Sequence, residues 1–463
     1  MNFERVIGRG RSNHRGIAKI DLIQYDYTSF KLSVDTMAKF LIEGGNPLSG
    51  QIAPIGNKNA ILKMMAATLL TKETVLISNV PAISDVEVMV ALLEDLGAKV
   101  TYKVKSGELA ITAKEITKNF LNPDLAKKMR SSNVLMGPLL VRTGSVTAHQ
   151  PGGDKIGPRE MNAHFDGFKQ LGAKVKINPD NSFTVSGKLT GAEVFLYEPS
   201  VTATENILMA AVLTPGITVI DNAASEPHVT ALTEMLISMG AQITGVGSNR
   251  LTVEGVKTLQ GVKVATPPDF VYIGTMIVLS VITGGTLTIK PVPQNFMKPF
   301  EYFFAKLGVT WTYTSDSLVV GKNQSKMITD TVWARTKGIY SQPWPCFPSD
   351  MMSLMIVLAT QVKGSMLFFE KMYPGRMFFA DFLNGMGANI IIADPHRVVV
   401  NGPTVLRGAH LYAPDLRAGM AFVAAGLVAK GATVVEAVEH IDRGYPSIEK
   451  TLSALGASIK RVQ

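Results

Sequence analysis

The stretch DVEVMVALLEDLGAKVTY, residues 85–102, contains the pattern on which the rest of the chain is built. Its first part has the apolar spacing of an amphipathic helix, and 98–102 alternates like a strand. Gly97 between them is best interpreted as the left-handed residue that ends the helix. The stretch therefore predicts a helix, a tight turn and a strand in immediate succession.

The same triplet, Leu or Met followed by Gly and then Ala or Val, occurs six times. Its glycines are Gly97, Gly172, Gly240, Gly308, Gly387 and Gly456. Successive glycines are 75, 68, 68, 79 and 69 residues apart. This period is longer than that of solenoid repeats, so it predicts six copies of a small α/β subdomain.

A second pattern, a turn followed by a β-rich run, occurs once in each unit. The runs are 72–80, 143–151, 215–223, 284–292, 363–371 and 430–438. The helices that precede them are apolar nearly all round, as at 59–70 and 418–429, and helices of this kind are buried. Each unit should thus combine strands with one amphipathic and one buried helix.

Six units can form one ring or two groups of three. The 463 residues exceed a comfortable single core, and the proline pair in 257–269 offers a place for a crossing connection, so two groups are favoured. Residues 1–36 do not fit the repeat. We expect them to form an N-terminal extension, either a disordered arm or an over-extended start before Met37.

The composition excludes several classes of protein. With 46% hydrophobic and 18% charged residues, the chain has too much apolar mass to be disordered. Its longest apolar stretches, 275–283 and 354–360, fall short of the ~20 residues of a membrane span, and we expect no secretory signal. The single Cys346 excludes an intramolecular disulfide and a cysteine-based zinc cluster, and favours a reducing compartment.

The net charge of +9 comes without a run of basic residues, and many of the arginines stand singly in turns that contain Gly or Pro. This distribution suits discrete phosphate and carboxylate pockets better than nucleic acid. The seven histidines show no paired spacing, so no metal site is predicted.

Two glycine-containing segments can carry chemistry. Lys58, in GNKNA before a buried helix, either helps to bind an anion at the helix start or is solvated beside an Asn57 cap. The loop 151–159, PGGDKIGPR, is long enough to act as a lid. Asp154 in this loop is either a turn residue or a general acid delivered by loop closure.

Two further segments combine charge with a predicted helix start. Lys128 and Arg130, followed by two serines, are either a phosphate site or a solvated pair of cations. Asp350, before an apolar helix, is interpreted first as a helix cap.

The C-terminal third adds Arg376 and the segments 415–417 and 440–445. Each of these alone is an ordinary salt-bridge candidate. Combined with the cations of the earlier segments, they would suit a ligand with several negative charges.

Seven segments together resemble the enolpyruvyl transferases, and within that family the enzymes that act on UDP-N-acetylglucosamine. They are GNKNA (56–60), PGGDKIGPR (151–159), SVTATENI (200–207), NAASEP (222–227), FPSDM (347–351), PDLRAG (414–419) and HIDRGY (440–445), in family order. The resemblance runs from about Met37 to Gln463. The DKS…SHR opening of the branch that makes 5-enolpyruvylshikimate 3-phosphate is absent, and GNKNA stands in its place.

The resemblance implies an α/β fold of the inside-out barrel type, with two domains of three βαβαββ subdomains each, which agrees with the repeat. The first domain would be 58–267, and the second would combine 37–57 with 268–463 because the chain crosses twice. Both substrates would bind between the domains. The resemblance implies an enzyme that needs no cofactor or metal, binds no nucleic acid and does not insert into a membrane. The protein is expected to be a cytoplasmic monomer or weak oligomer.

The resemblance also assigns site residues. Phosphoenolpyruvate would be held by Lys58, Asn59, Arg159, Arg417 and Arg443. UDP-N-acetylglucosamine would be held by Arg130, Arg159, Glu160, Met161, Asn162, Ala163, Asp350 and Met372, with Arg376 and Asp415 elsewhere in the cleft. The expected catalytic residues are Asp154, Asp350 and Lys58.

The implied reaction is an addition followed by an elimination, the committed step toward a peptidoglycan precursor. A general acid protonates C3 of phosphoenolpyruvate, and the sugar 3′-hydroxyl, deprotonated toward Asp350, attacks C2. Phosphate then leaves as C3 gives up a proton. Asp154 stands where most family members carry cysteine and some carry aspartate, so resistance to fosfomycin, which alkylates that cysteine, is expected.

Some positions depart from the family pattern. Residues 269–272 read Asp-Phe-Val-Tyr where Asp-Arg-Ile-Glu is usual, and Glu160 and Ser225 replace a proline and an arginine. Residues 374–376 read Pro-Gly-Arg in place of Glu-Asn-Arg. These changes bear on the nucleotide sugar rather than on phosphoenolpyruvate. The alternatives are a paralogue that acts on another acceptor and a non-catalytic regulatory paralogue, although the latter need not keep both acid and base.

Overall fold

The computed structural model describes residues 38–153, 156–157, 159–329 and 338–463. Residues 1–36, predicted to be an N-terminal extension, lie outside the described residues. In the described part, the strands form six sheets, five of four strands and one of three.

Three sheets are built from strands between residues 74 and 265. Their orders are β13 (Lys263–Ala265), β3 (Thr74–Ser78), β5 (Glu108–Thr112), β4 (Lys99–Lys103); β6 (Ser145–Ala148), β8 (Phe183–Ser186), β7 (Lys174–Ile177); and β11 (Gln242–Thr244), β12 (Arg250–Glu254), β10 (Ile217–Asp221), β9 (Glu193–Phe195). The helices with them are α1 (Lys58–Ala67), η2 (Thr68–Leu70), α2 (Ser84–Asp95), α3 (Pro123–Ala126), η3 (Arg130–Leu135), α4 (Met136–Thr143), α5 (Asn162–Gln170), α6 (Val201–Ala211) and α7 (Pro227–Ser238).

The other three sheets combine the first two strands with the C-terminal part of the chain. Their orders are β15 (Thr312–Thr314), β16 (Ser317–Val320), β14 (Leu287–Ile289), β2 (Gly50–Ile52); β17 (Gly338–Tyr340), β18 (Gly364–Phe369), β20 (Arg397–Gly402), β19 (Asn389–Asp394); and β21 (His410–Tyr412), β22 (Ala432–Glu436), β1 (Lys39–Glu43), β23 (Ser458–Val462). The helices with them are α8 (Phe270–Thr283), α9 (Gln294–Ala305), η4 (Ser349–Met351), α10 (Met352–Thr360), η5 (Pro374–Met377), α11 (Phe379–Gly385), α12 (Leu416–Val428), α13 (Glu439–Asp442) and α14 (Ile448–Ala454).

The predicted βαβαββ unit is confirmed. In the run β9, α6, β10, α7, β11, β12, strand β9 pairs in parallel with β10, and β12 pairs antiparallel with β10 and β11. In the run from β17 to β20, β17 is likewise parallel to β18, and β20 is antiparallel to β18 and β19. The chain therefore has the predicted α/β fold of repeated small subdomains.

The six repeat glycines all have positive φ, as predicted. Their φ angles are 100° at Gly97, 95° at Gly172, 104° at Gly240, 67° at Gly308, 100° at Gly387 and 108° at Gly456. An amphipathic helix ends just before each of them and a strand follows it. A residue with a Cβ would be strained in this conformation, which explains why a glycine marks every helix-to-strand turn.

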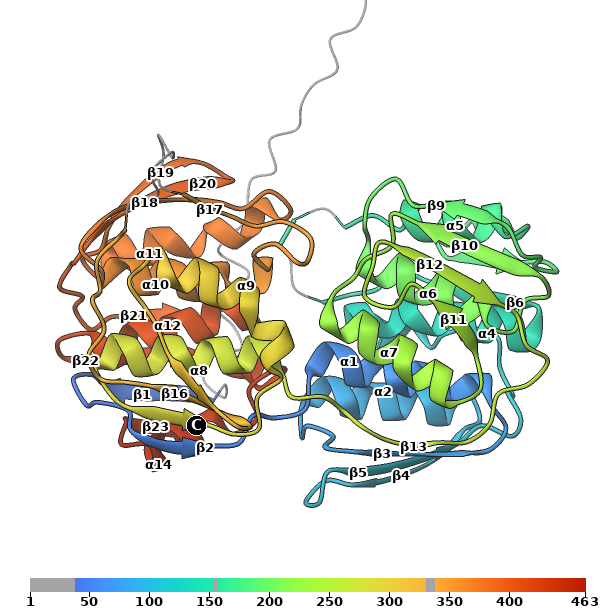
Figure 1. The fold of residues 1–463 in the computed structure, drawn as a ribbon, viewed down its shortest axis with the longest axis horizontal. Helices are drawn as coiled ribbons and strands as arrows, with labels where there is room; N and C mark the ends of the chain where they lie inside the picture. Colours follow the sequence, from blue (N-terminus) through green and yellow to red (C-terminus); the bar gives the residue numbers. More distant parts are fainter. Residues whose placement is uncertain (1–37, 154–155, 158, 330–337) are drawn as a thin grey trace, which may run out of the picture. The chain divides into compact units, whose positions relative to one another are not determined.

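Most buried apolar side chains of the described residues fall into two clusters. The first core contains residues from 60 to 259, and the second core contains residues from 40 to 52 and from 270 to 459. In the second core, α8, α10 and α12 pack on one another with their strands outside them (Figure 1). The helices predicted to be buried at 59–70 and 418–429 are buried, as α1 with η2 and as α12. The predicted domain boundaries themselves stay a prediction.

Distant segments complete some of the sheets. Strand β2 pairs in parallel with β14, and β13 pairs in parallel with β3. Between them, the backbone N–H of Asn57 donates to the carbonyl of Pro267 at 2.8 Å, and that of Asp269 donates to the carbonyl of Ile55 at 2.9 Å. The chain thus leaves the second core and returns to it at one place, next to the proline pair in which a crossing was predicted.

Candidate active site

A pocket of about 250 Å³ is lined by residues of both cores. Its charged lining residues are Lys58, Lys63, Asp85, Arg130, Arg159, Glu226, Asp350, Arg376, Asp415, Arg417 and Arg443. Seven of these are cations and four are carboxylates. The excess of positive charge favours an anionic ligand.

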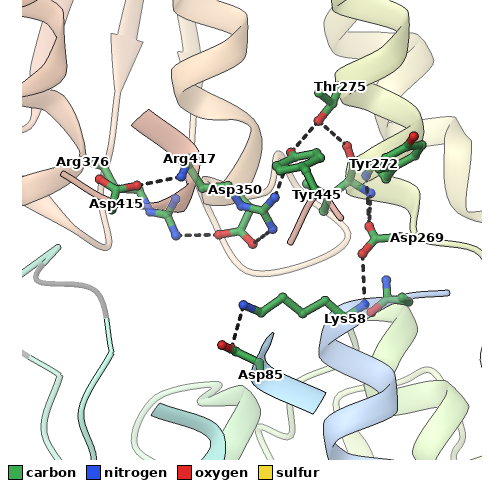
Figure 2. A network of polar contacts seen from close by, with 12 residues as sticks. Lys58, Asp85, Asp269, Tyr272, Thr275, Asp350, Arg376, Asp415, Arg417 and Tyr445 are labelled. Carbon is green, nitrogen blue, oxygen red and sulfur yellow. Dashed lines mark hydrogen bonds and ion pairs between the residues drawn. The ribbon is translucent and has the colours of Figure 1, made fainter. Parts of the chain in front are cut away.

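Asp350 bridges two arginines at one side of this pocket (Figure 2). Its Oδ1 accepts a hydrogen bond from Arg376 at 2.5 Å, and its Oδ2 accepts one from Arg417 at 2.7 Å. Burial acts to raise the pKa of this carboxyl, but the two guanidinium groups outweigh burial and hold the pKa well below its usual range. Asp350 is therefore ionised at neutral pH. Its first interpretation as a helix cap is wrong, since both oxygens bind arginines.

The start of α12 positions Arg417. Asp415 caps this helix, because its Oδ1 accepts from two backbone N–H groups of the first turn, that of Arg417 at 2.7 Å among them. The guanidinium of Arg417 also donates to the hydroxyl of Tyr445 at 3.0 Å, and that hydroxyl lies 2.7 Å from Thr275 Oγ1 (Figure 2). Arg417 is thus fixed at its backbone and at both ends of its guanidinium group.

Asp85 joins two cations at another side of the pocket. Its carboxylate lies 2.8 Å from Lys58 Nζ and accepts from Arg443 Nε at 2.9 Å. Burial acts to raise the pKa of Asp85, but Lys58 and Arg443 lower it further than burial raises it. Asn57 caps α1 as one alternative predicted, accepting from the N–H of Ala60 at 2.9 Å, but Lys58 is buried and paired rather than solvated.

Asp269 caps two helices at once. Its Oδ1 accepts from Val271 N at 2.8 Å and Tyr272 N at 3.0 Å in the first turn of α8. Its Oδ2 accepts from the backbone N–H of Lys58, the first residue of α1, at 3.1 Å (Figure 2). Negative charge at a helix N-terminus is favourable, and here one carboxylate supplies it to helices of both cores. The position of Lys58 is therefore tied to the second core.

The described part of the predicted lid contacts the pocket. Arg130 donates to the carbonyl of Arg159 at 2.6 Å and to that of Glu160 at 3.3 Å. The carbonyl of Ile156 accepts from Gly375 N at 3.0 Å, in the turn before Arg376. Burial, together with the charge of Arg159, lowers the pKa of Arg130 to about 10, so it remains a cation at neutral pH.

Most of the predicted site residues lie together. Those lining the pocket are Lys58, Asn59, Arg130, Arg159, Asp350, Met372, Arg376, Asp415, Arg417 and Arg443. Four predicted nucleotide-sugar residues are not in its lining: Met161 and Ala163 are buried, while Glu160 and Asn162 are exposed and bind each other at 2.5 Å. Asp154, the predicted general acid, lies outside the described residues. The ligand and catalytic roles of all these residues stay predictions.

Several pocket residues were missed from the sequence. Asp85 lies at a helix start, a pattern that usually indicates only a cap, and so does Asp269, which does not line the pocket but ties Lys58 to the second core. Lys63 had a clearer signal, because it is a cation inside a helix predicted to be buried. Glu226 and His228 lie in or just after NAASEP, which was used for the resemblance but was given no role.

Neither a metal centre nor a membrane span is evident in the described ranges. There, no group of three His, Cys, Asp or Glu side chains is arranged to hold a metal ion. No helix within those ranges is long and apolar enough to cross a bilayer. The one cysteine, Cys346, is exposed.

Known proteins resemble the chain over most of its length. The family model for EPSP synthase (3-phosphoshikimate 1-carboxyvinyltransferase) matches residues 42–452. The UDP-N-acetylglucosamine 1-carboxyvinyltransferase of Bradyrhizobium diazoefficiens is 44% identical over 424 residues, which cover 92% of this chain and 98% of the relative. The enzyme of the same name from Treponema denticola is 43% identical, with coverage of 92% and 99%.

Solved structures with lower identity share the fold. The enolpyruvyl transferase NikO from Streptomyces tendae matches with a TM-score of 0.82 at 22% identity, covering 92% of this chain and 99% of that one. EPSP synthase from Acinetobacter baumannii matches with a TM-score of 0.70 at 17% identity, covering 92% and 100%. With the family match and the relatives of 43–44% identity, these findings show that the chain belongs to the enolpyruvyl transferase family, among the UDP-N-acetylglucosamine 1-carboxyvinyltransferases.

Proposed function

We propose that this protein transfers the enolpyruvyl group of phosphoenolpyruvate to the 3′-hydroxyl of UDP-N-acetylglucosamine and releases phosphate. The observation that carries the proposal is that Lys58, Arg417 and Arg443 share one pocket with Asp350. The cations suit the phosphate and carboxylate of phosphoenolpyruvate, and the ionised carboxylate suits the proton of an attacking hydroxyl. The names of the relatives with 43–44% identity support the same activity.

Two of these cations are positioned by helix starts. Lys58 opens α1 and Arg417 lies in the first turn of α12, where Asp269 and Asp415 cap the backbone N–H groups, so the side-chain charges themselves supply the attraction for an anion. Asn59, Arg159 and Arg443 complete the proposed phosphoenolpyruvate site. Such preorganised positive charge also stabilises the departing phosphate, while the Asp350 carboxylate can stabilise the oxocarbenium-like character that develops at C2.

Asp350 is proposed to take the proton of the sugar hydroxyl as the new C–O bond forms at C2. In its ion pairs with Arg376 and Arg417 the carboxylate is a weak base, because both cations favour its charged form. An anionic substrate that binds Arg417 would compete for this guanidinium. The pKa of Asp350 would then rise toward a value suited to accepting a proton.

The general acid is proposed from the sequence alone to be Asp154, which lies outside the described residues. It would protonate C3 during addition. In the elimination, C3 returns a proton, the C–O bond to phosphate breaks and the C2–C3 double bond forms again. The net reaction thus needs no oxidant, reductant or metal.

Fosfomycin tests the assignment of Asp154. A carboxylate is a far poorer nucleophile toward an epoxide than a thiolate, so the unmodified protein should resist the compound and Asp154→Cys should become sensitive. Time-dependent inhibition and the mass of the treated protein measure both forms. A covalent mass shift on the unmodified protein, or a variant that is active yet resistant, would contradict this role.

The main test of function is phosphate release from phosphoenolpyruvate on addition of UDP-N-acetylglucosamine, with the product identified by mass. Lys58→Ala and Arg417→Ala should each lower kcat/KM roughly tenfold to hundredfold, since each removes a charge-assisted contact of about 1.5–3 kcal/mol. Lys103→Ala, which removes a surface cation paired with Glu108, is the matched control and should have no effect. Unchanged kinetics in both pocket variants would place the site elsewhere.

A different acceptor is the second candidate. Phe270 and Val271 line the pocket at positions where the family pattern has Arg and Ile, so one expected cation is replaced by an aromatic ring. Phosphate release with a panel of UDP-sugars distinguishes the two candidates. Preference for another sugar over UDP-N-acetylglucosamine would favour this second one.

The proposal extends to the setting of the reaction. The division into domains 58–267 and 37–57 with 268–463 is supported by the two cores and by the crossing at Asn57 and Pro267. Substrates would bind between these domains. In the cell, the product would serve cytoplasmic peptidoglycan synthesis, and through it cell shape and division.

A further inference from the structure

Four titratable side chains of the first core meet at a part of the pocket to which no role has yet been given. They are Lys63 of α1, Glu205 of α6, Glu226 just before α7, and His228 in the first turn of α7. Lys63, Glu226 and His228 line the pocket. Glu205 is fully buried, and its carboxylate lies 3.7 Å from Lys63 Nζ.

This cluster has unused hydrogen-bonding capacity. Both oxygens of Glu205, Oε2 of Glu226 and Nδ1 of His228 have no hydrogen-bond partner among the described residues. The distance between Lys63 and Glu205 exceeds that of a normal hydrogen bond. Buried polar atoms in native proteins are nearly always paired, so the unpartnered atoms of two residues that line the pocket, Glu226 Oε2 and His228 Nδ1, point to a polar ligand. His228, only 5% exposed, fits this best.

The cluster shares its pocket with the carboxylate that is proposed to activate the acceptor, since His228 and Asp350 both line it. Glu226 Oε1 accepts a hydrogen bond from the backbone N–H of Trp344 at 3.5 Å. Ser225 Oγ donates one to the backbone carbonyl of the same Trp344 at 3.2 Å. Trp344 also lines the pocket, so the pocket wall formed by Lys63, Glu226 and His228 continues into the second core.

The charge state of this wall suits a neutral polar ligand. Burial raises the pKa of Glu226 to about 7 and that of Glu205 to about 8, and it lowers the pKa of His228 well below its usual value. At neutral pH the wall therefore offers a neutral imidazole, the partly protonated carboxyl of Glu226 and the ammonium group of Lys63, which between them both donate and accept. Hydroxyl and amide groups match such partners, whereas a phosphate would favour the arginines across the pocket.

We propose that Lys63, Glu226 and His228 form a subsite that hydrogen-bonds the sugar ring of the acceptor and thereby determines which nucleotide sugar the protein uses. Glu205 acts behind them as a positioning residue for Lys63. The inference rests on the proposed function, because it takes the acceptor to be a nucleotide sugar activated at Asp350.

Binding calorimetry on the full chain tests the subsite by comparing UDP-N-acetylglucosamine with UDP, which has no sugar ring. His228→Leu and Glu226→Leu should each weaken binding of UDP-N-acetylglucosamine about tenfold and change binding of UDP less than about twofold. Glu234→Gln, at an exposed position of the same helix, is the matched control and should change neither.

The subsite proposal would be overturned if the variants lost affinity for UDP-N-acetylglucosamine and for UDP equally, or lost affinity for neither. Retained UDP binding shows that a variant has folded, and Glu226→Leu, which removes the polar atoms at similar volume, decides the outcome if His228→Leu does not fold. The variants should also lower the preference for UDP-N-acetylglucosamine over UDP-glucose in kcat/KM about tenfold, with the KM for phosphoenolpyruvate nearly unchanged.

The same measurements separate the subsite from the proposed function. If the unmodified protein binds UDP-N-acetylglucosamine without releasing phosphate, the proposed function fails while the comparison with UDP still decides the subsite. If the unmodified protein does not bind UDP-N-acetylglucosamine, both are overturned.

Discussion

Asp85 and Asp350 are both buried among cations, but they are assembled in different ways. Asp350 takes Arg376 and Arg417 from the second core, to which it belongs itself. Asp85, on α2 with the first core, takes Lys58 from the same side and Arg443 from the second core. The Asp350 group can therefore form as one half of the protein folds, whereas the Asp85 group requires both halves. A difference in function should follow, with Asp350 serving chemistry and Asp85 serving the assembly of the anion site.

The largest effect is expected for Asp350→Asn. Loss of the proposed base should lower kcat about 10²–10⁴-fold, as measured by phosphate release. The variant also leaves Arg376 and Arg417 without their anion, and breaking a buried pair costs about 3–5 kcal/mol, measurable by urea unfolding. Asp394→Asn, which disrupts a more exposed pair with Arg397, is the control. Activity within tenfold of the unmodified protein would remove Asp350 from the chemistry.

A smaller effect with a different kinetic signature is expected for Asp85→Asn. Lys58 and Arg443 would lose the carboxylate that holds them together, so the KM for phosphoenolpyruvate should rise about tenfold while kcat changes less. Steady-state kinetics with phosphoenolpyruvate varied at saturating acceptor measures this. If kcat falls as far as in Asp350→Asn, the proposed division of labour between the two carboxylates is wrong.

Acid should weaken the stabilisation by both carboxylates. Their cation partners lower the pKa of each group in the folded state below the unfolded value of about 3.9. The stabilisation is therefore fully present above about pH 4 and is lost as the pH falls through the folded-state values. Urea unfolding should show that the stability gap between the unmodified protein and Asp350→Asn narrows from pH 7 to pH 3. A gap that stays constant would contradict the ion pairing.

Glu205 should show the opposite dependence on pH, with the smallest effect. Burial raises its folded-state pKa to about 8, whereas the unfolded value is about 4.3. The folded state then keeps a proton that the unfolded state releases, so this group costs stability as the pH rises from about 4.3 to 8. Glu205→Gln should flatten that part of the stability profile. Parallel profiles for the two proteins would show that Glu205 is ionised when folded.

The fold was predictable because its signals are local and repeated. A glycine with positive φ is needed at every helix-to-strand turn, and a buried helix has to be apolar all round, so both features are readable residue by residue. The pairing of β13 with β3 and of β2 with β14 was harder to predict from the sequence. It depends on where the chain passes from one core to the other rather than on the composition of the strands.

The site was predictable where charge occurs within a specific motif, as at Lys58 and Arg417. Their partners could not be identified in the same way. Asp85 lies 27 positions after Lys58 and 358 before Arg443, and only the folded chain brings the three together. Glu226 belongs to a motif and His228 directly follows it, but their unpartnered hydrogen-bonding atoms can be identified only once their surroundings are known.

The crossing of the chain makes the whole first core an insertion in a connection of the second. Its entry and exit meet where Asn57 N lies 2.8 Å from Pro267 O, so a short link from residue 56 to residue 268 would excise the insert without breaking a strand of the second core. Asp269 would still cap α8, and β1 and β2 would still complete their sheets. The half with Glu226 and His228 is thus, in its topology, a cassette inserted into the half with Asp350 and Arg417.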